Sequence, residues 1–318
     1  MPVRLSVAYP LQVVHPDLVV PFAEFAAAHG MARLWLGQSL CVDAHLVAAY
    51  LAGRGVRVPL GTAVTLLPLR HPYQAALEAR SLAALTGLPY VAGFGAGDPV
   101  FVGNLAGRPY RSPRGAVGEY LSAVRALLDG RPLARRGPEF SVTGMLPPMG
   151  VQPPVEVGAG VLRPRMARTA GEVADVAITW LTPASYLGEV LAPALRAGAG
   201  GRARPPRVAS VVHVAVDRPG RHLAGLVRRS TAAHLEAPHY REMLRLAGVR
   251  LDGGAPEREL LASGAVLAGR PEEIADGLRG LHEAGADEIV LNPCGVLAGE
   301  GAPAALADLT EIMAALPS

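Results

Sequence analysis

The chain has 318 residues, of which 50% are hydrophobic and only 5% aromatic, so Ala, Val and Leu must build most of a large core. Every basic residue is arginine, and without a lysine amine Schiff-base aldolase and pyridoxal chemistry are excluded. The formal net charge of +3 is mild, and no basic run is interleaved with aromatic residues, which argues against a nucleic-acid partner.

The cysteines and the apolar runs bear on the cellular compartment. Cys41 and Cys294 lie far apart, which fits neither a disulfide framework nor a metal motif and favours a reducing cytoplasm. The opening "MPVRLSVAYP" lacks a charged region followed by a long apolar run, so no signal peptide is expected. No run of about 18 uninterrupted apolar residues occurs, so no membrane span is expected either.

Short apolar runs alternate with longer helical patterns along the first half of the chain. The runs that favour buried strands lie at 3–9, 32–38, 57–67 and 89–97. Each run precedes a helical pattern that begins at a capping residue or a proline and often ends at glycine. These helices are predicted at 17–30, 43–55, 71–87 and 112–130.

The second half repeats this alternation. Strands are predicted at 153–160, 174–180, 207–216 and 287–293, and helices at 163–171, 183–198, 271–285 and 302–316. The segment 217–269, with helical pieces at 221–237 and 239–248, is longer than one connection needs, so we interpret it as an insertion that forms a lid or an oligomer contact. Eight strand–helix units predict the α/β class and a (β/α)8 TIM barrel with an insertion after strand seven, built as a single domain over 1–318.

In such a barrel the functional residues lie at the carboxyl ends of the strands. This set contains few metal ligands, which argues against a metal-dependent hydrolase, and no GxSxG motif suggests a serine hydrolase. The candidates are Tyr9, Gln38, Ser39, Thr65, Asp98, Gly158, Gly160, Arg163, Thr179, Trp180, His213 and Asn292.

Glycines end two of the predicted strands. In "GFGAGDP" (93–99) the third glycine comes one residue too early for a dinucleotide motif, and Asp-Pro follows in place of a helix. Either these glycines pack tightly at a crowded rim, or they leave bare backbone for a flat ring or a phosphate. "VEVGAGVLRPR" (155–165) favours the second interpretation, because Gly160 opens onto a helix start beside Arg163 and Arg165. We therefore expect a long phosphorylated cofactor across the barrel mouth.

Two stretches resemble a known family. "VPLGTAVTLLPLRHPYQAALEARSLAALTGLPYVAGFGAG" (58–97) and "PRMARTAGEVADVAITW" (164–180) are similar to the bacterial luciferase-like superfamily of flavin- and deazaflavin-dependent oxidoreductases. The resemblance implies a (β/α)8 barrel with an insertion after strand seven. It also implies FMN or the deazaflavin F420 as the cofactor, used for monooxygenation or hydride transfer, and often a homodimer.

The resemblance also assigns residues. It places a non-proline cis peptide between Ala63 and Val64 behind the flavin ring, the segment Gly95, Ala96 and Gly97 beside the ring, and the phosphate at Gly160, Val161, Leu162 and Arg163. Other rim positions expected to contact the cofactor are Tyr9, Thr65, Gly158 and Trp180. No metal site is expected.

Two residues are catalytic candidates. Asp98 falls where some deazaflavin-dependent members carry a catalytic glutamate, with a capping role as the alternative. Gln38, followed by Ser39, stands where some dehydrogenase members have an Asp-His pair. His213 is interpreted equally well as a core residue or as a site residue.

Three functions remain open. The first is F420-dependent hydride transfer to an organic acceptor, such as a secondary metabolite or a dehydroamino acid in a modified peptide; it is favoured because an arginine-rich mouth would receive the anionic tail of F420. The second is an FMN-dependent monooxygenase that receives reduced FMN from a separate flavin reductase. The third is a non-catalytic flavin-binding relative. A flavin or F420 reductase and a small-molecule or peptide substrate are the expected partners.

Overall fold

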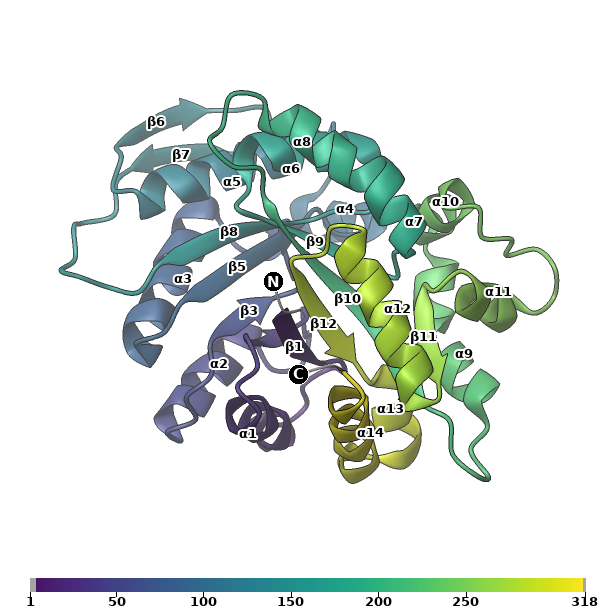
Figure 1. The fold of residues 1–318 in the computed structure, drawn as a ribbon. Helices are drawn as coiled ribbons and strands as arrows, with labels where there is room; N and C mark the ends of the chain where they lie inside the picture. The colour runs from purple at the N-terminus through teal and green to yellow at the C-terminus, as the bar shows by residue number, and fades with distance from the viewer. Residues whose placement is uncertain (1–3, 317–318) are drawn as a thin grey trace.

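The computed structural model describes residues 4–316 and contains a closed barrel of parallel strands (Figure 1). Around the barrel, each strand pairs in parallel with the next, and the last strand pairs with the first. This confirms the predicted (β/α)8 barrel. Its strands are β1 (Arg4–Tyr9), β2 (Leu34–Leu36), β3 (Leu60–Thr62), β5 (Tyr90–Gly95), β8 (Val155–Gly160), β9 (Val176–Trp180), β10 (Arg207–Val216) and β12 (Glu288–Asn292).

Helices surround the strands, as Figure 1 shows. Several begin where the sequence predicted, because a side chain caps the first turn: Asp43 accepts a hydrogen bond from the His45 N–H, and Ser112 accepts one from the Gly115 N–H. The helices of this outer layer are α1 (Val20–Ala28), α2 (Ala44–Gly53), α3 (Pro72–Thr86), α5 (Pro113–Leu128), α6 (Pro164–Val173), α7 (Ala184–Tyr186), α8 (Ala192–Ala199), α12 (Pro271–Glu283) and α14 (Ala302–Ala314).

The structure also contains elements that the sequence did not predict. The stretch expected as one strand at 57–67 is divided into β3 and β4 (Thr65–Leu66). Asp-Pro at 98–99 does begin a helix, α4 (Pro99–Ala106), which corrects the expectation that no helix follows these glycines. The remaining additions are the antiparallel hairpin of β6 (Leu133–Arg136) and β7 (Ser141–Gly144), and α13 (Cys294–Glu300).

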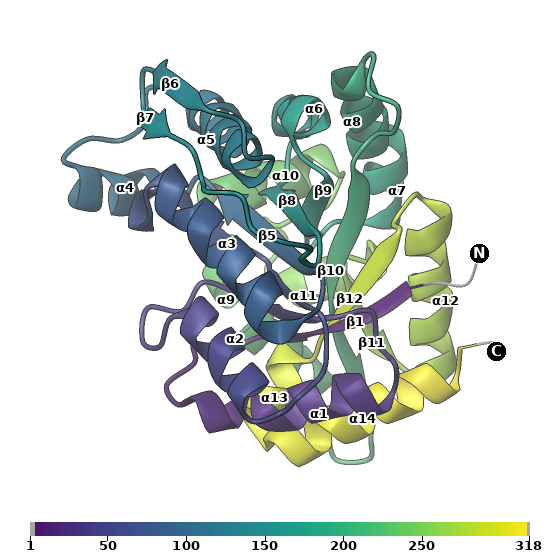
Figure 2. The same cartoon turned by 90° about the vertical axis from the view of Figure 1, so that its left-hand side faces the viewer.

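The segment 217–269 folds back onto the barrel. It forms α9 (Leu223–Glu236), α10 (Pro238–Leu246), α11 (Pro256–Ala262) and β11 (Val266–Gly269). β11 pairs in parallel with the carboxyl-terminal part of β10, from His213 to Val216. In Figure 2, α9, α10 and α11 are the green helices behind the strands. The insertion is therefore anchored on strand seven of the barrel, next to His213.

Two apolar clusters make up the core. The larger one fills the space between the strands and the helices, and the smaller one fills the barrel itself. Because strand side chains alternate between faces, the inward positions recur at every second residue. The buried members of the inner cluster are Ala8, Trp35, Ala63, Val91, Val176, Ile178, Ala209, Val211 and Val290.

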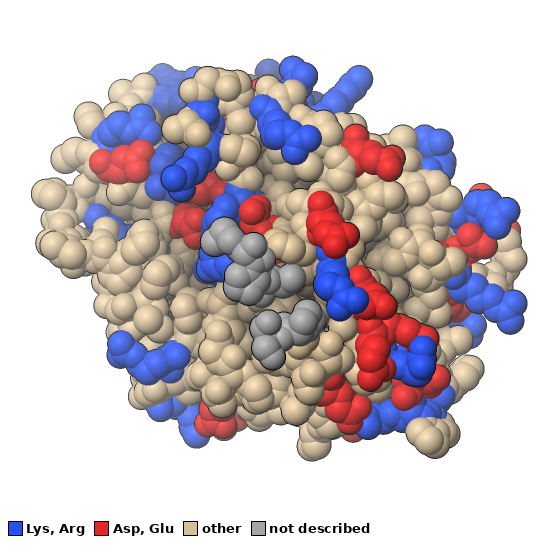
Figure 3. Space-filling view, in the orientation of Figure 1, with Lys and Arg blue, Asp and Glu red and all other residues tan. Residues whose placement is uncertain are grey.

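Charged side chains of both signs are interspersed on the face of the molecule that Figure 3 draws, in keeping with the small net charge. No helix within residues 4–316 is long and apolar enough to cross a membrane.

Candidate functional site

The inward positions at the carboxyl ends of the strands divide the barrel mouth into two halves. On β2, β3, β5 and β8, or directly after them, they are occupied by glycine or alanine; we call this the bare half, and it consists of Gly37, Ala63, Gly95 and Gly160. On β9, β10 and β12 they carry large polar side chains; we call this the polar half, and it consists of Trp180, His213 and Asn292. The division follows from the strand alternation that also builds the inner core.

Three of the glycines are needed for the protein's own packing. A Cβ on Gly93 would lie 2.0 Å from the Thr62 carbonyl oxygen, and one on Gly158 would lie 2.9 Å from Ile178 Cδ1. A Cβ on Gly95 would lie 2.7 Å from Val64 Cγ2. The tight-packing interpretation is thus supported at these positions, and the cofactor contact expected at Gly158 stays a prediction.

Gly160 and Gly97 have different reasons to lack a side chain. The nearest atom to a Cβ on Gly160 would be Val64 Cγ1 at 3.5 Å, which is an ordinary contact, so the protein itself leaves room there. Gly97 has φ of +84°, a conformation that favours glycine. Among the predicted cofactor positions, Gly160 is thus the one where bare backbone is not explained by packing or by φ.

The peptide bond between Ala63 and Val64 is cis, at the position that the resemblance implied. The Val64 side chain lies against the glycine ends of β5 and β8. Thr65 donates a hydrogen bond from Oγ1 to the Gly93 carbonyl at 3.1 Å, so its hydroxyl ties β4 to β5. These contacts hold the rim of the bare half in one arrangement.

Gln38 has a local partner at each end of its amide. Its Oε1 accepts a hydrogen bond from the Leu66 N–H at 3.2 Å, and its Nε2 donates to the Ser39 carbonyl at 2.7 Å. The side chain thereby fastens the end of β2 to β4. This geometry gives Gln38 a positioning role and speaks against the expectation that it is catalytic.

Asp98 is exposed and caps α4. Its Oδ1 accepts hydrogen bonds from the N–H groups of Val100 at 2.8 Å and Phe101 at 3.2 Å. The capping alternative is therefore the one that the geometry supports, and the catalytic expectation for Asp98 has no support from it.

Other predicted positions face the outer core. The Tyr9 ring packs edge-on against Phe22 of α1, with the ring centres 5.4 Å apart, and Val161 is buried in the same outer core. Ala96 and Leu162 are partly buried and pack against that core. Tyr9 nevertheless borders a small cavity of about 50 Å³ at the mouth, together with Gln38, Ala63 and Trp180. The structure thus brings four predicted site residues to one cavity.

Arg163 lies at the start of α6, where the first N–H groups of the helix lack helical partners. Its side chain is exposed and makes no capping hydrogen bond. Burial lowers the pKa of His239 on α10 and the Arg163 charge lowers it further, so Arg163 acts on the insertion as well as on α6. A helix start with an arginine beside it is well suited to hold a phosphate.

In the polar half, His213 and Asn292 are buried and Trp180 is partly buried. His213 is 2% exposed and Asn292 is fully buried. Within residues 4–316, no hydrogen-bond partner reaches either ring nitrogen of His213, Nε1 of Trp180 or Nδ2 of Asn292. The other end of the Asn292 amide is used, because Oδ1 accepts a hydrogen bond from the Cys294 N–H at 3.0 Å. Buried polar atoms without partners are costly, so a cluster of them at one place indicates a ligand or ordered water.

Aromatic rings from the insertion close this cluster. His234 of α9 stacks on Trp180, with ring centres 5.6 Å apart, and meets His213 edge-on at 5.7 Å. Tyr240 of α10 meets His234 edge-on at 4.8 Å. Sequence reasoning missed His234 and Tyr240 because they belong to the insertion, although two histidines and a tyrosine within 234–240 stand out in a chain with few aromatic residues.

Burial sets the charge of these histidines. It lowers the pKa of His213 well below the usual value, and the neighbouring His234 lowers it further. Burial also lowers the pKa of His234 to about 4, although the Ser230 backbone partly opposes this shift and His239 adds to it. Both imidazoles are therefore neutral at neutral pH, and each can donate one hydrogen bond and accept another.

Two features of the described chain bear on alternative sites. No group of three His, Cys, Asp or Glu side chains that could hold a metal ion occurs in the described chain. A cleft of about 1050 Å³ begins at Gln38, which also borders the mouth cavity, and runs along α2 and α3, where its lining includes the exposed side chains of Leu46 and Leu85. Trp180, His213 and Asn292 do not line this cleft, so the chemistry-bearing cluster and the large hollow are separate.

Comparison with known proteins gives a family and a fold. The sequence model of the family described as luciferase-like monooxygenase matches residues 2–288. The 4-hydroxyprotoasukamycin monooxygenase of Streptomyces nodosus subsp. asukaensis is 27% identical over 185 residues, which are 50% of this chain and 50% of that protein. The chain thus matches about half the length of this curated relative.

Solved structures agree on the architecture. An F420-dependent secondary alcohol dehydrogenase in complex with an F420–acetone adduct superposes with a TM-score of 0.76 at 17% identity, and the match covers all of both chains, 100% of each. The oxygenating constituent of the 3,6-diketocamphane monooxygenase of Pseudomonas putida, in complex with FMN, has a TM-score of 0.66 at 17% identity and covers 95% of this chain and 98% of that one. At such identities the likeness concerns the fold alone.

Proposed function

Because the chain belongs to the family of luciferase-like monooxygenases, we propose that it is an oxidoreductase whose barrel mouth binds the deazaflavin F420 and transfers a hydride to an uncharged organic acceptor. The observation that carries this proposal is the division of the mouth into a bare half and a polar half. A flat cofactor needs a surface without large side chains, and a substrate needs side chains that orient it. The bare half and the polar half offer these two surfaces next to each other.

The residues present fit a flavin-type cofactor. Arg163 and the start of α6 would hold its anionic end, and Gly160 is the bare position beside them. When bound, such a cofactor supplies the hydride or, in the case of reduced FMN, activates oxygen. The chain's own part is to fix the cofactor against the rim at Val64, to orient the substrate through the polar half, and to exclude water with α9 and α10.

The choice between F420 and FMN rests on charge. F420 carries a longer anionic tail than FMN, and the start of α6 offers Arg163 and Arg165, both exposed. An FMN-dependent monooxygenase with a separate flavin reductase is the second candidate, favoured by the name of the curated relative. A secondary metabolite or a dehydroamino acid in a modified peptide is the acceptor class that we expect.

Cofactor titration tests the proposal. We expect purified protein to bind reduced F420 more tightly than reduced FMN, and to consume no oxygen with F420 alone. Oxygen uptake that depends on reduced FMN would favour the monooxygenase, and binding of a flavin without turnover on any acceptor would favour a non-catalytic relative. Binding of neither cofactor would overturn the assignment.

Two substitutions locate the cofactor. Arg163→Ala should weaken FMN binding at least tenfold more than riboflavin binding, because only FMN carries the phosphate. Arg168→Ala, at an exposed arginine farther along α6, is the matched control, and equal losses in both variants would place the anion elsewhere. Gly160→Ala should weaken binding of either cofactor while the melting temperature stays unchanged, since a Cβ there meets its nearest neighbour at 3.5 Å. Gly95→Val would be a poorer test of cofactor binding, because Val64 already occupies the space that the new side chain would need.

Binding requires the mouth to open. Its cavity of about 50 Å³ is far smaller than a typical ligand site of roughly 300–1,000 Å³. The insertion contributes His234 and Tyr240 to the cover, so we expect α9 and α10 to move outward. A separate reductase, a homodimer, a single domain over 1–318 and a cytoplasmic location stay predictions from the sequence.

A further inference from the structure

The polar half of the mouth carries a more specific inference, which rests on the proposed function. We propose that Trp180, His213 and Asn292 bind the carbonyl oxygen of the substrate, and that this substrate is an uncharged conjugated carbonyl compound. The oxygen would take the hydrogen bonds that these buried side chains do not make within the described chain.

The hydrogen-bonding inventory of the polar half favours an acceptor atom. Trp180 offers one N–H, the Asn292 amide offers two, and neutral His213 offers one donor and one acceptor nitrogen. Donors thus outnumber acceptors by about four to one. A carbonyl oxygen accepts two or more hydrogen bonds and donates none, so it matches this set better than a hydroxyl or an ammonium group does.

The electrostatics favour an uncharged substrate. Besides burial, only the neutral neighbour His234 shifts the pKa of His213, so within residues 4–316 no charged side chain exerts a comparable influence on that ring. A carboxylate or phosphate would lose its hydration here without gaining the compensating charge of an arginine. Arg163 is near Glu242, Tyr186 and His239 instead, at the rim.

The walls favour a flat, conjugated group. The ring of Trp180 and the rings of His234 and Tyr240 enclose the free nitrogens. Aromatic faces of this kind stack on planar groups, as Trp180 and His234 now stack on each other with an interplanar angle of 25°. A planar enone or aryl ketone can lie between such faces while its oxygen points at His213.

The two sides of the mouth use their side chains differently. At the end of β2, the Gln38 amide is engaged with Leu66 and Ser39. The imidazole that faces the mouth comes instead from His213 on β10. The substrate oxygen is thereby held across the mouth from the bare half, which leaves the cofactor side free.

A set of three probes tests the oxygen and its charge. Benzylideneacetone is an uncharged conjugated ketone, trans-cinnamate is its anionic counterpart, and trans-β-methylstyrene lacks the oxygen. We expect calorimetric titration of the full chain, with and without oxidised FMN, to give a dissociation constant for benzylideneacetone at least tenfold below those of the other two. Equal affinities for all three, tighter binding of cinnamate, or no binding of the ketone in either condition would overturn the proposal.

Variants separate this proposal from the cofactor proposal. His213→Phe keeps the size of the ring and removes both nitrogens, so it should lose at least tenfold in ketone affinity, whereas His213→Gln should recover part of it. His29→Phe, on the exposed end of α1, is the control and should bind as the wild type does. Cofactor affinity should stay within about twofold in His213→Phe. If FMN or F420 binding falls in parallel with ketone binding, the polar half belongs to the cofactor and the proposal of a carbonyl site fails. If neither the wild type nor any variant binds a cofactor while the ketone still binds, only the proposed function fails.

Discussion

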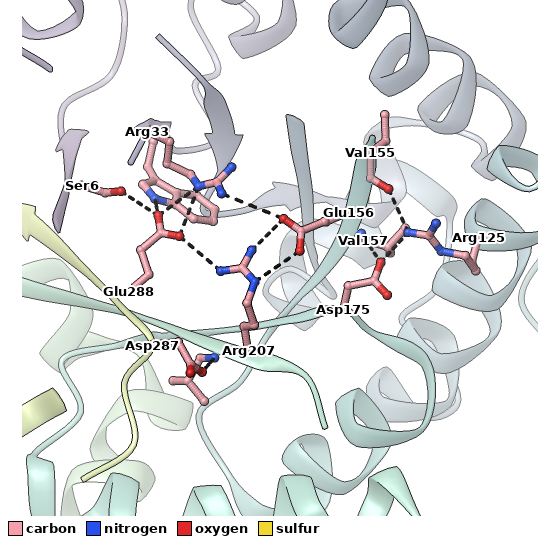
Figure 4. Close-up of polar contacts among 12 residues, drawn as sticks. Ser6, Arg33, Arg125, Val155, Glu156, Val157, Asp175, Arg207, Asp287 and Glu288 are labelled. Carbon is pink, nitrogen blue, oxygen red and sulfur yellow. Dashed lines mark hydrogen bonds and ion pairs between the residues drawn. The ribbon is translucent and has the colours of Figure 1, made fainter. Parts of the chain in front are cut away.

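The two ends of the barrel treat buried polar groups in opposite ways. At the amino end, six inward side chains form what we call the basal network, which consists of Ser6, Arg33, Trp35, Glu156, Arg207 and Glu288 (Figure 4). Glu288 is fully buried and accepts hydrogen bonds from Ser6 Oγ at 2.6 Å, Trp35 Nε1 at 2.8 Å and Arg33 Nε at 3.0 Å. In the basal network, Arg33 Nη1 is the one buried polar side-chain atom without a hydrogen-bond partner within residues 4–316, whereas at the carboxyl end His213, Asn292 and the partly buried Trp180 leave four nitrogens without one.

The pKa shifts express the same contrast. Burial alone would raise the pKa of Glu288, but Arg33, Ser6, Trp35 and Arg207 together hold it below the usual value. The network therefore keeps its carboxylate charged. At the mouth, burial lowers the pKa of His213 and no carboxylate opposes it, so that end is neutral.

The contrast teaches which end serves stability and which serves binding. Polar groups that the protein itself satisfies need no ligand, and charges held by several partners resist rearrangement. Polar groups that the described residues leave without partners cost free energy unless something else supplies the bonds. In barrels of this type, function lies at the carboxyl end of the strands, and the location of the polar half agrees.

The largest expected effect is at the basal network. Glu288→Gln would leave Arg33 and Arg207 buried against a neutral amide, so we expect it to lower the free energy of unfolding by about 3–5 kcal/mol. Chemical denaturation at pH 7 measures this. Glu259→Gln, which breaks the exposed pair with Arg250, is the control and should cost less than about 1 kcal/mol. A loss at Glu288 as small as that of the control would mean that the basal network contributes little to stability.

The second effect is a pH dependence that arises at the mouth. His234 has a pKa of about 4 in the fold against 6.5 as its ordinary value, and the pKa of His213 is lowered as well. Between these values the unfolded chain binds protons that the folded chain does not, so stability is greatest above pH 6.5 and falls as the pH drops towards 4. Each histidine contributes a slope of at most about 1.4 kcal/mol per pH unit.

Denaturation midpoints at pH 7, 6 and 5 measure that slope, before most carboxylates begin to titrate. The double variant His213→Phe/His234→Phe should flatten it. Any slope that remains would come mainly from His239, whose pKa burial and Arg163 also lower, although Asp98 opposes this. An unchanged slope in the double variant would show that the two imidazoles are hydrated and titrate normally.

Much of the fold could be predicted because its signals are local. Asp43 and Ser112 sit directly before helical patterns, and the apolar runs mark the barrel strands with boundaries that differ by a few residues. The helix after Asp98 was missed although its signal is equally local: an acid that caps, followed by proline in the first turn. The expectation for that stretch is based on its glycines, and the helix start at Asp98 and Pro99 is therefore not recognised.

The site was only partly predictable because its partners are distant in the chain. Alternation along β9, β10 and β12 brings Trp180, His213 and Asn292 to one face of each strand, and that much follows from the sequence. The His234 ring reaches Trp180 only because the segment 217–269 folds back onto the barrel, and no local sequence pattern specifies that path. In the same way, Arg33 and Glu288 pair across 255 residues, and only the closed barrel brings them together.

The third effect reverses the sign of the first. Replacing His213 with Phe removes two buried nitrogens that lack partners within the described chain, so the free energy of unfolding at pH 7 should rise by about 1 kcal/mol. Thermal and chemical denaturation of the ligand-free protein both measure this. A loss of stability in Glu288→Gln together with a gain of stability in His213→Phe would confirm the contrast between the two ends of the barrel. A loss of stability in His213→Phe would show that the ring nitrogens do have partners, such as ordered water.

The smallest effect concerns Asp98, which follows β5 at the rim of the bare half. Removing its cap with Asp98→Ala should cost about 1 kcal/mol or less, because one of the two N–H bonds it accepts is long, at 3.2 Å from Phe101. Asp98→Asn keeps an oxygen in the same place and should preserve both stability and turnover. Turnover on any accepted substrate therefore decides whether Asp98 is a helix cap or a catalytic acid. A loss of turnover of a hundredfold or more in Asp98→Asn, with the melting temperature unchanged, would identify Asp98 as a catalytic acid. The functional region would then extend beyond the polar half to the start of α4.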